Sequence, residues 1–158
     1  MRISKLVLAA FLVIFSGCGS LKDGGYSVTG LGSSDGDAAI AFGKIVSEQA
    51  EVGVSAVFYA VEDDHYTPSF GPYAAYLIPM PADVAEDWQP FTGAALLMET
   101  EDFGWIPKAF GGVIYKPKDA LAPYYMAEKA WPSDDISTPD ISDRGDNIWH
   151  WFGLRLKF

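Results

Sequence analysis

Apolar residues occur in short runs along this chain, and clusters of Gly, Pro, Asp and Ser separate the runs. Beyond the first 17 residues, every helix-length window with apolar residues at i, i+3, i+4 and i+7 also contains a helix breaker, so we expect helix to be a minor feature. The runs are rich in Val, Ile, Tyr, Phe and Ala, which favours short strands. The pattern predicts eight strands, at Tyr26 to Gly32, Ala38 to Val46, Glu51 to Val61, Ser69 to Ile78, Pro90 to Glu99, Ile106 to Lys116, Ala120 to Trp131 and Asn147 to Phe158.

The final segment, IWHWFGLRLKF, has the most regular alternation in the chain. Period-2 alternation of this kind is typical of a strand with one apolar and one polar face. The alternation does not tell which face is turned inward, and Ala120 to Trp131 is apolar on both faces. The apolar set in the final segment is Phe152, Leu154, Leu156 and Phe158, and the opposite set is Gly153, Arg155 and Lys157.

The connections between the strands fall into two sets, because successive connections of an up-and-down sheet lie at opposite ends. One set contains 12 Asp or Glu residues and a single base, Arg144. This asymmetry is consistent with a barrel that crosses a membrane, and also with solvated loops that simply collect acids. The acidic set is Ser33 to Asp37, Glu62 to Pro68, Thr100 to Trp105 and Pro132 to Asp146; the other set is Ser47 to Ala50, Pro79 to Gln89 and Pro117 to Asp119.

A short basic stretch at the start of the chain precedes an uninterrupted apolar run from Leu6 to Phe15. The run has the length of a signal-peptide core and about half the length that a membrane-spanning helix needs. The next residues, Ser16-Gly17-Cys18, resemble the lipobox at which bacterial lipoproteins are cleaved and lipidated. We therefore expect a signal peptide at residues 1–17, lipidation of Cys18 and a linker at residues 18–25. The alternative is ordinary cleavage at the small residues around the cysteine, which removes it.

The composition limits the chain to a simple architecture. Its 158 residues are enough for one ordinary domain. A single cysteine excludes an intramolecular disulfide and a cysteine-rich metal site. The net charge of −10 opposes binding to nucleic acid. We expect one folded domain, a β-barrel over residues 26–158, and no nucleic-acid partner.

The C-terminal pattern resembles the assembly signal of bacterial outer-membrane barrels, whose last strand has alternating apolar residues and a final aromatic residue. The segments FGKIVSEQAEVGVSAVFY, FGPYAAYLIP and PFTGAALL resemble strands of small OmpA-like and opacity-like barrels. This resemblance implies an all-β fold, an eight-stranded antiparallel up-and-down β-barrel, whose last strand is read by the barrel-insertion machinery. The chain departs from these families at Ala75, where they often place an inward arginine, and in its lipobox. The assembly-signal positions are Gly153, Leu154, Leu156 and Phe158.

Strand parity in such a barrel assigns each side chain to the lumen or to the outer wall. A salt-bridge network from Glu99 or Glu128 to Arg155 or Lys108 is expected to fill the lumen, and two rim carboxylates in solvent are the alternative. Gly153 shares the predicted lumen face with these carboxylates and with Arg155. The side chains expected to face lipid are Val52, Val54, Leu154 and Leu156.

Aromatic residues gather near the strand ends and predict two girdles at the membrane interfaces. Without a membrane, the same residues would be core aromatics. The girdle near the acidic connections is expected to contain Trp105, Trp131, Trp149, Trp151, Tyr59 and Phe70, and the opposite girdle Trp88, Phe91, Tyr115 and Phe158.

The sequence contains no recognisable catalytic, nucleotide-binding or metalloprotease motif. His65 lies in the acidic segment EDDHYTPS close to Ser69, a grouping that could serve acyl transfer. Its spacing matches no motif, and loop histidines are usually solvated. His150 lies between two tryptophans in a predicted strand and needs no special role. The Arg-Gly-Asp tripeptide at residues 144–146 is short enough to arise by chance.

The segment SDDISTPDISDRGDN concentrates five aspartates. Hard cations such as Ca²⁺ favour carboxylate ligands and could bridge them to lipopolysaccharide phosphates. The spacing is not that of an EF-hand loop, so a solvated acidic loop is the alternative. The candidate ligands of a divalent cation are Asp134, Asp135, Asp140, Asp143 and Asp146.

The sequence favours an integral outer-membrane barrel with a structural, adhesive or surface-interaction role, and no catalytic activity or cofactor is expected. The expected partners are outer-membrane lipid, lipopolysaccharide and the insertion machinery, and a monomer is expected. The first alternative is a soluble β-barrel lipoprotein, tethered at Cys18, that binds a small apolar ligand in a lipocalin-like interior. A lipid-modifying barrel enzyme is the second. The membrane barrel and the tethered lipoprotein differ in polarity, because a membrane barrel needs an apolar exterior and a soluble barrel needs an apolar interior.

Overall fold

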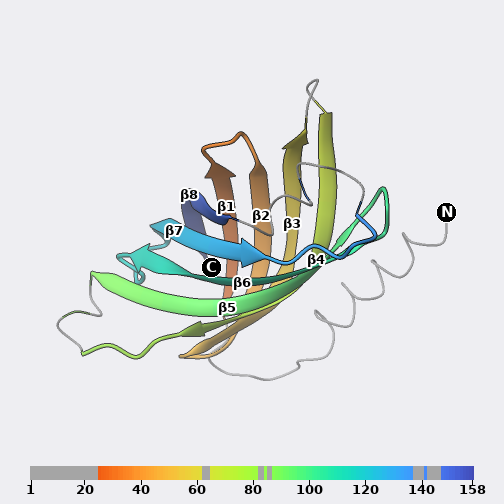
Figure 1. Ribbon diagram of the computed structural model, residues 1–158. Coiled ribbons are helices and arrows are strands. Elements are labelled where there is room, and N and C mark those ends of the chain that lie inside the picture. The colour runs from red at the N-terminus through yellow and green to blue at the C-terminus, as the bar shows by residue number, and fades with distance from the viewer. Residues whose placement is uncertain (1–24, 62–64, 82–83, 85–86, 137–140, 142–146) are drawn as a thin grey trace.

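The computed structural model describes residues 25–61, 65–81, 84, 87–136, 141 and 147–158. These residues form a closed barrel in which each strand pairs antiparallel with its sequence neighbours and the last strand pairs with the first (Figure 1). The predicted eight-stranded antiparallel up-and-down β-barrel is confirmed. No helix in the described part of the chain is long and apolar enough to cross a membrane. The strands are β1 (Tyr26–Ser33), β2 (Ala38–Ser47), β3 (Ala50–Val61), β4 (His65–Leu77), β5 (Trp88–Glu99), β6 (Trp105–Tyr115), β7 (Leu121–Ala130) and β8 (Ile148–Lys157).

All eight strands lie where the hydrophobic pattern predicts them, and most of their ends shift by one or two residues. The largest shift is in β4, which begins at His65 and not at Ser69, because its pairing with β3 continues through Pro68. β6 ends one residue before the predicted Lys116. That residue has a φ of 47°, a left-handed conformation that turns the chain toward β7.

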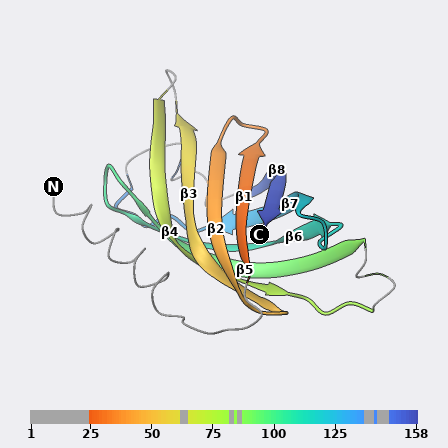
Figure 2. The ribbon, with the colours of Figure 1, turned by 180° about the vertical axis from the view of Figure 1, so that it is seen from behind.

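The pairing of β1 with β8 closes the barrel. Seven Cα pairs join the two strands. Next to them, the Tyr26 N–H donates to the Phe158 carbonyl at 2.9 Å, and the Phe158 N–H donates back to the Tyr26 carbonyl at 3.1 Å. Views from opposite sides show β1 and β8 next to each other (Figures 1 and 2). None of the eight strands therefore presents a free edge to solvent or to another chain.

The two ends of the barrel differ in their connections. We call the end with the tight connections the turn end; the start of β1 and the end of β8 also lie there. We call the opposite end the loop end. One longer connection, between β4 and β5, also lies at the turn end. Of the described residues, the turn end holds 48–49, 78–81, 84, 87 and 116–120, and the loop end holds 34–37, 100–104, 131–136, 141 and 147.

Side chains alternate between the lumen and the outer wall along every strand, as expected for a barrel. In β8, Arg155 is buried, whereas Leu154 and Leu156 on either side of it are exposed on the outer wall. Glu99 and Glu128 are also buried in the lumen. The predicted lumen positions are therefore confirmed, Gly153 among them by its parity. Val52 and Val54 lie on the outer wall with Leu154 and Leu156, as predicted.

One stretch of the barrel wall lacks regular pairing. The pairing of β4 with β5 stops after Phe70 and resumes at Tyr73. Pro72 lies in this gap and has no N–H with which to continue the ladder, which explains the missing pairs. Gly71 lets the two strands stay close, because a Cβ there would clash with the Leu96 carbonyl oxygen.

Gly153 makes the closure of β1 against β8 possible. A Cβ on Gly153 would clash with the carbonyl oxygen of Gly30, whereas a Cβ on Gly30 meets nothing within 4 Å. We expect Gly153→Ala to lower the free energy of unfolding by about 1–3 kcal/mol, as overpacking does. The matched variant Gly30→Ala is expected to change it by less than about 0.5 kcal/mol. Urea unfolding of the two variants measures the difference, and equal values would contradict a tightly packed seam.

Candidate functional site: a charged lumen inside an apolar wall

Glu51 is the centre of a polar cluster in the lumen near the turn end. Its side chain comes from the start of β3, faces inward and is buried. The carboxylate accepts hydrogen bonds from the Ser27 hydroxyl at 3.0 Å and from the Tyr73 hydroxyl at 2.6 Å. It also accepts a hydrogen bond from the Arg155 guanidinium, which makes a buried ion pair. Gly43 provides the space, because a Cβ there would overlap the carboxylate. The cluster thus joins four strands through one charged group.

A second buried ion pair lies closer to the loop end. The Lys108 Nζ of β6 donates to the Glu128 Oε1 of β7 at 2.7 Å, and both side chains are almost fully buried. The ammonium group also lies 5.2 Å from the centre of the Tyr59 ring and 5.8 Å from that of Trp151. A carboxylate and two aromatic faces thus offset the loss of water around this cation.

A cavity of about 70 Å³ lies in the lumen, and members of both ion pairs line it. Both small and large side chains line it. Its volume is about half of the ~150 Å³ of an apolar cavity that holds one benzene molecule. This cavity is therefore too small for a ligand of lipocalin size. The small side chains are Ala39, Ala41, Ser55, Ala75 and Ala95, and the large ones include Phe91, Phe110, Tyr124, Met126 and Trp151.

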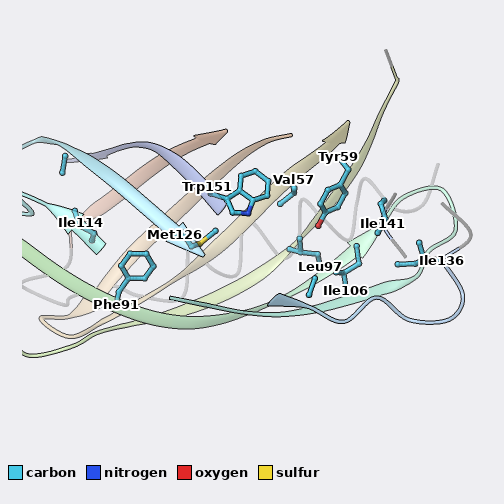
Figure 3. Close-up of a cluster of buried hydrophobic side chains, with 12 residues drawn as sticks. Val57, Tyr59, Phe91, Leu97, Ile106, Ile114, Met126, Ile136, Ile141 and Trp151 are labelled. Carbon is cyan, nitrogen blue, oxygen red and sulfur yellow. The ribbon is translucent and has the colours of Figure 1, made fainter. Parts of the chain in front are cut away.

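An apolar layer fills the lumen toward the loop end. Leu97, Ile106 and Tyr59 are fully buried and belong to one cluster (Figure 3). Ile136 and Ile141, from the connection between β7 and β8, pack into the same cluster. The sequence predicted only solvent or cation contacts for this acidic connection. It also contributes side chains to the core.

Glu99 is fully buried at the loop end of β5 but belongs to neither ion pair. Its carboxylate accepts hydrogen bonds from the backbone N–H groups of Glu101 and Asp102, both at 2.6 Å. These bonds hold the tight connection to β6, in which Phe103 has a φ of 58°. Of the two carboxylates predicted as alternatives, Glu99 is therefore not the one that forms a salt bridge, because two nearby N–H donors already satisfy it.

The predicted ionic network is confirmed in part. Glu128 pairs with Lys108, as expected, but Arg155 pairs with Glu51, which the sequence analysis did not select. A signal for Glu51 was present, since Glu51, Gly53 and Ser55 alternate with valines. Parity therefore indicated a lumen carboxylate there, although it did not identify the partner.

The outer wall of the barrel is almost entirely apolar. None of the outward positions in the eight described strands is Asp or Glu, and the bases among them, Lys44, Lys129 and His150, lie near strand ends. A soluble monomer rarely exposes a continuous apolar surface of more than a few hundred Å². Exposed large apolar side chains include Ile40, Phe42, Val52, Phe58, Tyr76, Leu96, Leu121, Phe152, Leu154 and Leu156.

The predicted aromatic girdles are confirmed only in part. Trp105 and Trp131 are exposed on the outer wall near the loop end, and Trp88 and Phe158 are exposed near the turn end. The assignment is wrong for some other aromatic residues, because their parity places them in the lumen. These buried side chains are Tyr59, Phe91 and Trp151.

The other predicted sites stay predictions. Cys18 and the signal peptide lie outside the described residues, as do Asp140, Asp143 and Asp146 of the candidate cation loop and the Arg-Gly-Asp tripeptide. Asp134 and Asp135 are exposed. Within the described part of the chain, no group of three or more His, Cys, Asp and Glu could hold a metal ion.

The two histidines take different positions. His65 is the first residue of β4. His150 lies on the outer wall of β8, where its Nδ1 is 2.8 Å from the Tyr125 hydroxyl of β7. The rings of Tyr125 and His150 stack with centres 6.1 Å apart.

Two solved structures resemble this barrel. The N-terminal β-barrel domain of Pseudomonas aeruginosa OprF aligns with a TM-score of 0.59 and 12% sequence identity, over 85% of this chain and 96% of that one. A chain described under the de novo design of transmembrane β-barrels aligns with a TM-score of 0.54 and 15% identity, over 85% and 94%. At these identities the likeness shows the fold alone. No family model and no curated protein matches the sequence.

Each buried ion pair is expected to depend on both of its partners. Lys108→Met leaves the Glu128 carboxylate buried without its cation, and we expect a loss of about 3–5 kcal/mol in the free energy of unfolding. The double variant Lys108→Met, Glu128→Met leaves no unpaired charge and is expected to be more stable than Lys108→Met. Chemical denaturation of the two single variants and the double variant measures the coupling. Additive effects within about 0.5 kcal/mol would contradict a direct interaction.

Glu99 is expected to stabilise the connection between β5 and β6. Replacing Glu99 by Leu leaves the N–H groups of Glu101 and Asp102 without acceptors, which we expect to cost about 1–3 kcal/mol. Hydrogen exchange should accelerate at these two amides before it changes in β7 or β8. The variant Glu99→Gln retains one carbonyl acceptor and is expected to be intermediate. Unchanged exchange at both amides in Glu99→Leu would contradict this role.

Proposed function

We propose that this chain is an integral β-barrel protein of the bacterial outer membrane with a closed lumen. The observation that supports this most is the inverted polarity of the barrel. Its outward side chains are apolar apart from a few near the strand ends, while Glu51, Lys108, Glu128 and Arg155 are buried inside. A lipid bilayer stabilises such an exterior, and a closed ladder satisfies the backbone groups that lipid cannot.

The lipocalin-like alternative requires the opposite arrangement. A soluble barrel that binds an apolar ligand needs an apolar cavity and a polar exterior. Here the cavity is small and lined in part by two ion pairs. Exposed side chains such as Phe152, at 60%, and Leu154, at 51%, would meet water. The geometry therefore favours the membrane barrel over the tethered soluble domain.

The filled lumen favours a structural or surface-interaction role over diffusion of solutes. Two ion pairs and an apolar layer occupy it. We propose a monomer without catalytic activity or cofactor, which reaches the outer membrane through its signal peptide. Cys18 would add a lipid anchor, and the insertion machinery would read the last strand. The recognition residues would be Gly153, Leu154, Leu156 and Phe158.

Charges placed on the outer wall test this proposal. The double variant Leu154→Arg, Leu156→Arg is expected to lose about 2–4 kcal/mol for each arginine close to the bilayer midplane, and less near an interface. We therefore expect it to fail to assemble in the outer membrane. Asp35→Arg, a charge change on an exposed loop residue, is the control and should assemble normally. Fractionation of the envelope measures both, and normal assembly of the double variant would contradict the proposal.

A further inference from the structure

We propose that Lys129 and His150 bind a phosphate group of lipid A, the lipid part of lipopolysaccharide, on the outer wall. This inference rests on the proposed function, because it requires the wall to face lipid. Among the outward positions of the described strands, these are the bases near the loop end, and Lys44 lies near the turn end. If the loop end faces outward, the pair lies at the level of the outer leaflet.

The register of β7 and β8 brings the two bases together. Lys129 pairs with Ile148, and Ala127 pairs with His150. Lys129 and His150 are therefore diagonal neighbours on the same face, at a separation of about 7–8 Å between backbone positions. Lysine carries its charge on a long flexible stem, so the Lys129 ammonium group can extend toward the His150 position.

Tyr125 holds the His150 ring in position. Its hydroxyl lies 2.8 Å from Nδ1, and the two rings stack. The Phe152 ring packs against the Tyr125 ring, with the two ring centres 5.1 Å apart. When the hydroxyl donates to Nδ1, the proton of a neutral imidazole lies on Nε2, which can then donate to a phosphate oxygen. His150 can thus bind the anion without becoming charged.

The charge of Lys129 is open to an external anion. Within the described part of the chain, the Lys129 side chain makes no ion pair or hydrogen bond. Lys108, by contrast, is buried and forms an ion pair with Glu128. A cation at a lipid interface is stabilised by headgroup anions, and phosphate is the anion of the outer leaflet that suits an ammonium group and an imidazole N–H.

The wall next to the two bases is apolar. Ala109 lies opposite Lys129, and Gly111 lies opposite Ala127, so small residues of β6 flank this part of β7. Trp131, exposed next to the end of β7, marks the interfacial level. A lipid with a phosphate on the bases can therefore lay an acyl chain along the apolar wall, which favours lipid A over free phosphate.

Lipid titration of the folded protein tests the proposal. The full chain, folded in neutral detergent, is titrated with lipid A and with dephosphorylated lipid A, and native mass spectrometry counts the complexes. We expect the phosphorylated form to bind about tenfold more tightly, equivalent to 1.4 kcal/mol. The variant Lys129→Gln, His150→Phe is expected to lose this preference. The control Lys116→Asn, which removes an exposed lysine at the turn end and suits its positive φ, should keep it.

The outcomes separate this site from the proposed function. Boiling-dependent migration on gels first establishes that each variant is a folded barrel. A folded wild type that binds both lipids equally, or a double variant that keeps the preference, would overturn the lipid site and leave the membrane barrel in place. Loss of the preference in Lys116→Asn would overturn it too, because binding would then depend on total charge. A wild type that does not fold in detergent would overturn both proposals.

Discussion

The pairing of β1 with β8 is the interaction on which the rest of this structure depends. It completes a hydrogen-bonded ladder around the barrel, so that backbone polar groups need no water apart from the interrupted stretch at Pro72. Only such a closed ladder allows an apolar outer wall, because unpaired N–H and C=O groups are costly in lipid. Gly153 permits the close approach of the two strands at the seam. Closure also creates the enclosed lumen in which charged side chains must find partners.

The lumen satisfies its charges by pairing them. The Glu51 carboxylate pairs with Arg155 and accepts hydrogen bonds from two hydroxyl groups. The Lys108 ammonium group pairs with Glu128 and lies near two aromatic rings. Leaving any of these charges alone in the interior would destabilise the barrel strongly. The ion pairs and the apolar layer near the loop end together fill the space that a wider barrel would leave as a channel. On the outer wall, Lys129 and His150 lie near the loop end.

Much of this architecture follows from period-2 alternation, which identified the eight strands and the inward or outward direction of residues such as Arg155 and Leu154. Alternation does not give the stagger between strands, so it could not show that Arg155 meets Glu51. It also could not show that Glu99 binds its own connection, or that Ile136 and Ile141 enter the core, since these contacts follow from loop conformation. For Trp151 and Tyr59, which lie near strand ends, parity is a better guide to burial than proximity to the strand end. The pair of Lys129 and His150 emerges only once the register of β7 and β8 is known.

The central claim is that this barrel is closed and embedded in lipid through its apolar wall. Extraction of envelope membranes with alkaline carbonate and urea, followed by gel electrophoresis with and without boiling, tests it most directly, and the Cys18→Ala variant removes any lipid anchor. The account predicts that wild type and variant both stay in the membrane fraction and migrate differently when unboiled, because a closed barrel resists unfolding. Release of the Cys18→Ala protein into the soluble fraction would contradict it and would identify a tethered soluble domain.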